Sequence, residues 1–339
     1  MSALTAVGAS VPSAGARSRC AASSAAPPKE VCEGVERYER NLSLTPAESP
    51  EVHGLVYEQY ADGRVTVLKH APHTTPDIPS TGPDIPADAV KDNRVFIYVD
   101  GIHQDLACQH DQIHRLLQAP RKDPSQGVSA DQPVIGIHEA AGVNAGIDGT
   151  RIALDLGWLK ALQGHFLPMS IIRTAAFRSD MAVKSVHDEV KQSLAAGRDV
   201  QIALHSGGGA ETALALNLIA REDGGRWKNV IRDHVRILAL APAASFKDFE
   251  VAGVKKDSIY YTASQHDPVY KLAHAYVPPS QMAVLLARST AVGVHLLFNP
   301  DVGPVHAPDY IFWRNMKPDG SQPIQAFLDG GAGSTNIFD

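Results

Sequence analysis

Short apolar runs alternate with helical patterns between residues 94 and 298, and this alternation limits the fold more than any other feature of the sequence. Nearly continuous apolar runs of about six residues are typical of strands that are buried on both faces of a parallel sheet. We therefore predict an α/β fold, with a mostly parallel twisted sheet, right-handed crossovers and helices on both faces. The predicted strands are residues 94–99, 133–138, 199–204, 235–240, 258–263 and 292–298.

Helical periodicity fills several of the intervals between these strands. Residues 181–196 carry apolar side chains at every third or fourth position and stop before Gly197, a residue type that often ends helices. Residues 149–162 and 211–220 also predict helices. Ahead of the alternation, residues 53–69 contain two β-rich runs around an Ala-Asp-Gly turn, which predicts an antiparallel hairpin at the entrance to the sheet.

Composition is that of a soluble globular enzyme and excludes several kinds of partner. Of 339 residues, 44% are hydrophobic and 20% are charged, and no apolar run approaches the roughly 18 residues of a membrane-spanning helix. The net charge of -6 and the lack of a Lys/Arg cluster argue against nucleic acid as a partner. The composition does not exclude peripheral contact with a membrane. The three cysteines, Cys20, Cys32 and Cys108, do not predict a disulfide framework.

The first 45 residues differ from the rest and are expected to form a disordered segment ahead of one catalytic domain at residues 46–339. Ala, Ser, Gly and Pro dominate the first thirty positions, and the first acidic residue is Glu30. Such a segment buries too little apolar surface to order itself. Its Ser-rich, acid-poor character with Arg17 and Arg19 resembles an organelle transit peptide or the N-terminus of a bacterial secreted effector. An unstructured tail that carries no targeting signal is an equally weighted alternative. The sequence therefore does not decide between a cytoplasmic and a secreted protein.

The clearest chemical signal lies in residues 199–216. An apolar strand leads through His205 into Ser206 and three consecutive glycines, and a helical pattern follows. A tight turn between a strand and a helix holds a serine hydroxyl out over the sheet, because glycines remove the side chains that would clash with both elements. The free N–H groups of the following helix point at the same place. Ser206 is therefore the predicted nucleophile, and a connecting turn that binds phosphate through its amides is the alternative.

This arrangement resembles the nucleophile elbow of the α/β-hydrolase family of lipases, esterases and thioesterases, whose pattern is Gly-x-Ser-x-Gly. Residues 204–208 read Leu-His-Ser-Gly-Gly, so Leu204 replaces the first glycine. A small residue is expected at that position, and a leucine there requires a local adjustment of the turn. The resemblance covers roughly residues 94–310, and it implies a triad of serine, acid and histidine in that order along the chain.

Two later turns supply the partners that this order requires. After the run at residues 258–263, Asp267 precedes Pro-Val, which resembles the turn that carries the acid in the family. After the run at residues 292–298, His306 lies in a loop from which an imidazole can reach the serine. His306 would be the base that takes the serine proton, and Asp267 would hold the imidazole in its productive tautomer.

Each partner also has a simpler explanation. An aspartate before proline often caps a helix or closes a turn, which is the alternative for Asp267. The alternative for His306 is a histidine in a surface loop. His266 and Asp301 are the substitutes if either assignment fails.

Two backbone amides are expected to stabilise the negative charge that develops on a substrate carbonyl. In the family, one comes from the residue after the nucleophile, here Gly207, and the other from the loop after an earlier strand. That loop follows the run at residues 94–99, so Ile102 or His103 would supply the second amide. Asp100 in the same loop also fits a purely structural turn residue.

No metal or organic cofactor is required by this scheme. His110 and His114 have the i, i+4 spacing that can hold a metal on one helix face, but a fourth ligand and an HExxH pattern are missing. We expect that segment to form a helix in which the face with these histidines is partly exposed. His138 and Glu139 follow a predicted strand and are expected to line the cleft rather than to bind metal.

The resemblance implies a serine hydrolase that cleaves an ester or a thioester through an acyl-enzyme on Ser206, which water hydrolyses with the help of His306. The expected substrate is a small-molecule or lipid ester. Apolar residues between Leu154 and Ile172 fit either an acyl-chain pocket, which would favour a lipid ester, or ordinary core packing. Two other functions stay open: an acyltransferase with the same triad, and a non-catalytic binding protein with the same fold.

Overall fold

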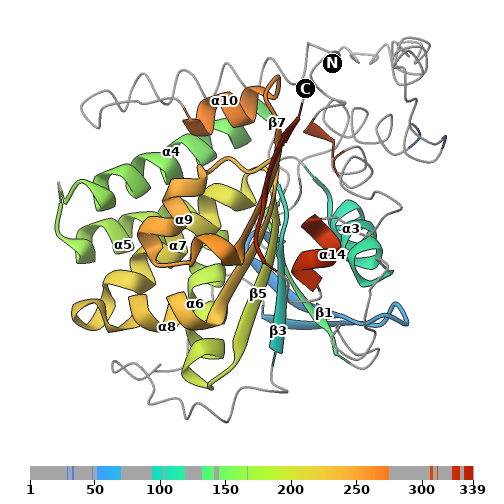
Figure 1. Ribbon diagram of the computed structural model, residues 1–339, viewed down its shortest axis with the longest axis horizontal. Helices are drawn as coiled ribbons and strands as arrows, with labels where there is room; N and C mark the ends of the chain where they lie inside the picture. Colours follow the sequence, from blue (N-terminus) through green and yellow to red (C-terminus); the bar gives the residue numbers. More distant parts are fainter. Residues whose placement is uncertain are drawn as a thin grey trace, which may run out of the picture.

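A twisted sheet runs through the centre of the computed structural model (Figure 1). In the part of the chain that the structure describes, this sheet has eight strands in the order β2-β1-β4-β3-β5-β6-β7-β8. Neighbours are parallel from β4 through β8, whereas β1 runs antiparallel to both β2 and β4. The strands are β1 (Leu55–Gln59), β2 (Val65–Lys69), β3 (Arg94–Val99), β4 (Val134–His138), β5 (Asp199–His205), β6 (Val235–Leu240), β7 (Ile259–Ser264) and β8 (Thr335–Phe338).

The described residues include nearly all of the predicted elements. The N-terminal segment, apart from a few residues, and the strand expected at residues 292–298 lie outside them. The structure describes residues 52–69, 94–101, 104–118, 132–140, 145–165, 167–274, 306–307, 323–328 and 332–338, together with Lys29, Glu33, Glu48 and Ile311.

The other predicted strands are confirmed, each with ends within one residue of those expected, and so is the entry hairpin of β1 and β2. Side chains of the central strands alternate between two separate cores. Ile97, Ile202 and Ile237 belong to one core, and Phe96 and Leu238 to the other. Both faces of the strands are therefore buried, which is why their sequences are apolar without interruption.

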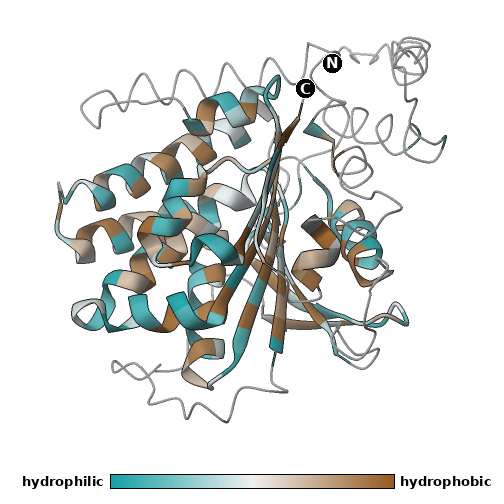
Figure 2. Cartoon of the chain, in the orientation of Figure 1, coloured by the Kyte–Doolittle hydropathy of each residue, from teal (hydrophilic) through white to brown (hydrophobic). Residues whose placement is uncertain are grey.

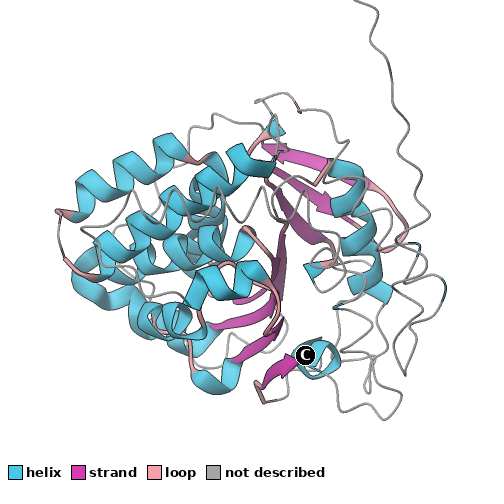
Figure 3. Ribbon diagram, turned by 90° about the horizontal axis from the view of Figure 1, so that it is seen from above, coloured by secondary structure: helices cyan, strands magenta, loops and turns pink. Residues whose placement is uncertain are grey.

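Helices cover the two faces of the sheet unequally (Figures 1 and 3). The larger layer holds α4 to α9, and α3 and α14 lie on the opposite face. Figure 2 shows apolar strands between helices whose outer faces are hydrophilic. The helices are α3 (Leu106–Gln118), α4 (Ala145–Gln163), α5 (Met169–Ser179), α6 (Met181–Ala195), α7 (Gly208–Arg221), α8 (Arg226–His234), α9 (Phe246–Ala252), α10 (Pro268–His274) and α14 (Pro323–Leu328).

Helix α7 is the centre of the larger layer. Every residue from Gly208 to Ala220 is buried, and the helix packs against α4, α6, α8 and α9. It begins three residues before the predicted start, directly after the turn that contains Ser206. Among the helices in the described ranges, none is both long and apolar enough to cross a bilayer.

Candidate active site

Ser206 occupies a strained turn between β5 and α7. Its φ is +50°, in the left-handed region that residues with a side chain rarely adopt, so surrounding contacts must hold it there. Its N–H donates to the carbonyl of Leu240 at 3.2 Å, and its own carbonyl accepts from the N–H of Ala243 at 2.7 Å. The end of β6 and the loop after it therefore fix the turn that presents the serine.

Two glycines allow the chain to close around this turn. A Cβ on Gly208 would lie 2.4 Å from the carbonyl oxygen of Asp100, and a Cβ on Gly101 would lie 2.5 Å from the Cβ of Ser206. Both distances are far below van der Waals contact, and the first involves backbone that cannot swing aside. The loop after β3 thus abuts the serine, as expected for the loop that would carry the second oxyanion amide.

Leu204, which was expected to require a local adjustment of the turn, lies in the regular part of β5. It is fully buried and keeps regular pairing between Val99 of β3 and Ala239 of β6. Strand β5 continues in register through His205, and only then does the chain turn. The small side chain of Ala239 on the neighbouring strand is consistent with a leucine being accommodated where the family pattern has glycine.

The structure brings the three predicted triad residues together. His306 Nε2 lies 2.8 Å from Ser206 Oγ, and His306 Nδ1 lies 2.7 Å from Asp267 Oδ2. All three side chains are buried. The serine hydroxyl can therefore donate to Nε2 while Nδ1–H donates to the carboxylate, which is the arrangement that general-base activation of a serine requires.

Asp267 makes both contacts that its sequence context suggested. Its Oδ2 accepts from His306, and its Oδ1 accepts from the N–H of Val269 at 2.8 Å, in the first turn of α10. The cap and the triad contact therefore use different oxygens of one carboxylate. Neither substitute is needed: His266 is exposed, and Asp301 lies outside the described residues.

His205 contacts the main chain of His306, which the sequence did not lead us to predict. Its Nε2 lies 3.0 Å from the carbonyl oxygen of His306, and its Nδ1 lies 2.9 Å from Gln104 Nε2. Gln104 in turn accepts a hydrogen bond from Gln112, which also accepts one from Tyr98 on β3. A buried polar chain therefore runs from the sheet to the main chain of His306. The available sequence signal was only a histidine directly before the predicted nucleophile.

Burial, together with the nearby His306, lowers the pKa of His205 to about 3, so this imidazole is neutral at physiological pH. With Nδ1 accepting from the Gln104 amide, the proton is on Nε2 and is donated to His306. A neutral ring here also avoids placing a second positive charge 5.0 Å from the His306 ring when that ring is protonated during catalysis.

Replacing His205 by phenylalanine is expected to slow acylation of Ser206 by about 10- to 100-fold, because the main chain of His306 loses its donor and small misplacements of a catalytic base are costly. The ring volume is retained, so the core stays filled. Rates of covalent labelling measure the effect. Tyr270→Phe in α10, which keeps its backbone contact with His274, is a matched aromatic control that should leave the rate unchanged. Equal labelling rates for His205→Phe and wild type would show that His205 does not position His306.

Of the predicted oxyanion donors, Gly207 is described and the other two are not. Gly207 is the N-cap residue of α7 and directly follows Ser206, as the prediction required. Ile102 and His103 lie outside the described residues. The loop that contains them begins at Gly101, whose contact with Ser206 is given above.

Asp100 holds the start of this loop. Its Oδ1 accepts from the N–H of Glu139 at 2.6 Å, and its Oδ2 lies 2.7 Å from His138 Nδ1. The other ring nitrogen of His138 lies 2.7 Å from Glu48. Burial alone would lower the pKa of His138, but Asp100 and Glu48 raise it to about 10, so this ring is an imidazolium. Asp100 is thus a structural residue, which was the alternative at that position.

His138 and Glu139, which were expected to line the cleft, are both buried: His138 is held between Asp100 and Glu48, and no hydrogen-bond donor among the described residues reaches the carboxylate of Glu139. His110 packs its ring against Tyr57 and, within the described ranges, belongs to no group of three potential metal ligands, nor does His114. Such a group is formed instead by Glu139, Asp180 and Glu211.

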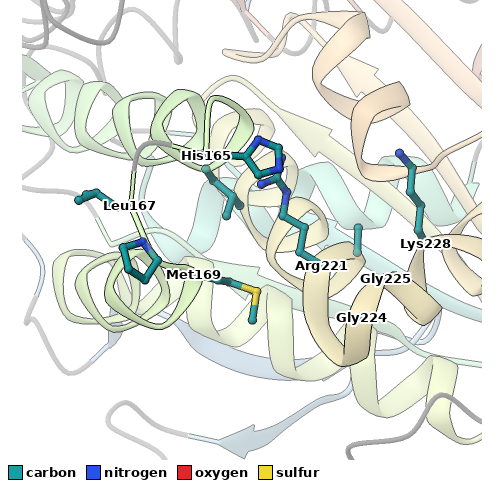
Figure 4. A pocket seen from close by; sticks show the side chains of 10 residues that line it. His165, Leu167, Met169, Arg221, Gly224, Gly225 and Lys228 are labelled. Atoms are coloured by element: carbon teal, nitrogen blue, oxygen red, sulfur yellow. The ribbon is translucent and has the colours of Figure 1, made fainter.

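An open cavity of about 870 Å³ lies away from the triad (Figure 4). Its lining includes Leu162, Leu167 and Arg221. Arg221 ends α7, so the cavity is at the opposite end of this helix from Ser206, about 20 Å along its axis. Leu162 and Leu167 therefore do not form an acyl-chain pocket at the serine. Leu159 is buried in the core, as the packing alternative required.

Comparison of the chain with models of protein families, with curated proteins and with solved structures finds no match. The functional argument therefore depends on the geometry described above.

Proposed function

We propose that this chain is a serine hydrolase of the α/β-hydrolase type that cleaves an ester or a thioester. One observation carries the proposal: Ser206, His306 and Asp267 form a continuous hydrogen-bonded relay, with links of 2.8 Å and 2.7 Å, at a strained turn between a parallel strand and a helix. The order of these residues along the chain is also the order that the hydrolase resemblance implies.

In the proposed reaction, Ser206 Oγ attacks the carbonyl carbon of the ester while His306 Nε2 accepts the hydroxyl proton. The imidazolium that results is stabilised by Asp267 through Nδ1–H. When the tetrahedral intermediate collapses, the bond to the alcohol or thiol breaks, and the leaving group takes the proton from Nε2. A water molecule then attacks the acyl-enzyme, again giving its proton to His306, and the acid product and free serine are released.

The backbone around the serine supports this chemistry. The N-terminus of α7 is directed at Ser206, and its partial positive charge favours the negative oxygen of the tetrahedral intermediate. Gly207 is positioned as one amide donor, and the loop that starts at Gly101 would supply the other.

Pre-steady-state hydrolysis of p-nitrophenyl esters with short and long acyl chains tests the proposal. Because acylation and deacylation are separate steps, we expect a burst of about one p-nitrophenol per protein when deacylation is slower. The chain length with the highest kcat/KM identifies the acyl preference. Absence of turnover with every ester and thioester tried, in protein that labels with no serine reagent, would contradict the proposal and favour a binding protein.

The same assay separates hydrolysis from acyl transfer. A hydrolase releases free acid at a rate that added alcohols or amines leave nearly unchanged. A transferase would instead form product only in proportion to the acceptor, with little free acid.

A further inference from the structure

A group of buried carboxylates lies behind the oxyanion loop, on the side of the sheet covered by α4, α6 and α7. Glu139 follows β4, Asp180 is the N-cap of α6, and Glu211 is in the first turn of α7. One oxygen from each lies within 4.8 Å of the others. Exposed fractions of the three residues are 1% each, so water does not solvate their charge.

Most oxygens in this group have no hydrogen-bond donor. Both oxygens of Glu139, both oxygens of Glu211 and Oδ2 of Asp180 are buried without a partner. The other oxygen of Asp180 is occupied, because it accepts from Ala182 N–H at 2.7 Å and lies 3.0 Å from His53 Nε2. Among the described residues, five buried oxygens therefore lack a hydrogen-bond donor, and one oxygen from each residue faces the other two, whereas buried acceptors of this kind normally have a partner.

Asp155 on α4 gives a second, independent indication. It lies outside the three-residue group, it is 1% exposed, and no N–H or O–H group of the described residues donates to its oxygens, although it can share a proton with the neighbouring Asp180. Four segments of the chain thus contribute buried carboxylates to this region, and the cap of α6 accounts for only one oxygen of Asp180.

The charge of this region is not balanced by the described side chains. The buried carboxylates are Glu139, Asp148, Asp155, Asp180 and Glu211, and among the described side chains the cation that contacts them is Arg151. His53 Nδ1 accepts from the N–H of Ala140, so its ring is not counted as a cation. Five carboxylates against one guanidinium leave an excess of four negative charges when all are ionised. Either protons or a cation must offset this repulsion.

We propose that Glu139, Asp180 and Glu211 bind a Ca²⁺ ion. Carboxylate oxygens are the ligands that hard divalent cations prefer, and Ca²⁺ takes several of them at about 2.3–2.6 Å. Oxygens across such an ion are about 5 Å apart, so the observed limit of 4.8 Å fits one shared ion. Mg²⁺ fits less well, because it usually retains waters and takes only one or two carboxylates. The sequence had indicated no metal at Glu139.

The site would link the end of β4 to the starts of α6 and α7 near the nucleophile. Glu211 is five residues after Ser206, and the N–H of Glu139 donates to Asp100, which starts the oxyanion loop. The ion would therefore stabilise the fold around the triad without touching the substrate.

Calorimetric titration of chelator-treated full-length protein with CaCl₂ tests the site. We expect about one equivalent of Ca²⁺ to bind, and a matching concentration of MgCl₂ not to displace it. At about 100 times the Kd, Ca²⁺ should raise the melting temperature by about 5 °C or more. These readouts are independent of catalysis, so the proposed hydrolase activity and the ion site succeed or fail separately.

Glu211→Gln keeps the shape of the side chain and removes its charge, so it should weaken Ca²⁺ binding by about tenfold or more. Glu139→Gln should do the same from a different element. The control is Glu189→Gln, which changes a buried carboxylate about 13 Å further along α6 and should bind Ca²⁺ as wild type does. No saturable Ca²⁺ uptake by wild type, or uptake that both site variants retain, would overturn the proposal and assign the excess charge to bound protons.

Discussion

Alanine in place of Ser206 is expected to lower the turnover of an ester substrate by about a millionfold, because no other atom is positioned to form the acyl-enzyme. Replacement of His306 by alanine should cost about as much, since the serine then keeps its proton. The double variant should be no slower than either single variant, because Ser206 and His306 act as one unit with a 2.8 Å contact. Steady-state kinetics of the three proteins measure this non-additivity.

Folding must be intact for that comparison. Ser206→Ala keeps the Cβ and the backbone contacts with β6, so its melting temperature should stay near that of wild type. His266→Ala is the control, because this histidine is an exposed neighbour of Asp267 and should retain full activity. A Ser206→Ala protein within tenfold of wild-type activity would refute the assignment of the nucleophile.

Asparagine in place of Asp267 is expected to lower kcat by about 10⁴-fold with little change in KM. The backbone N–H of Val269 donates to Oδ1 of Asp267, so the amide oxygen of asparagine would occupy that side. Its NH₂ group would then face His306 Nδ1, where Asp267 Oδ2 now accepts. Nδ1 would become the acceptor, the proton would move to Nε2, and the ring would lose its ability to take the serine proton.

The matched control is Asp233→Asn, which removes a carboxylate from an exposed ion pair with Arg232 and Lys255 and should leave kcat unchanged. Kinetics with a p-nitrophenyl ester check both variants. A loss below tenfold for Asp267→Asn, or a loss confined to KM, would show that Asp267 is only the cap of α10.

The central strands could be predicted because burial on both faces leaves a continuous apolar run. Strand β8 was missed, since its four residues alternate between exposed and half-buried, and among the described strands it pairs with β7 alone. Helix α8 was also missed, because its sequence is mostly polar and only Trp227 and Ile231 are buried. Helix α7 starts earlier than predicted, because glycines that disfavour helices are needed where Gly208 meets the backbone of β3.

The three residues of the proposed triad could be predicted because each follows an apolar run typical of a strand, and strand ends in a parallel sheet meet at one edge. The supporting groups were not. Gln104 and His205 are 101 positions apart, and no local pattern indicates their contact. The carboxylates of the proposed ion site are also far apart in sequence, although each stands at the end of a strand or at the start of a helix.

Intact-mass analysis after reaction with a fluorophosphonate tests the central claim most directly. The activated serine should give a single adduct in wild type, located on Ser206 by peptide mapping, and no adduct in Ser206→Ala or His306→Ala. An adduct that persists in Ser206→Ala, or wild-type protein that forms none, would contradict the claim that Ser206, His306 and Asp267 are a working catalytic triad.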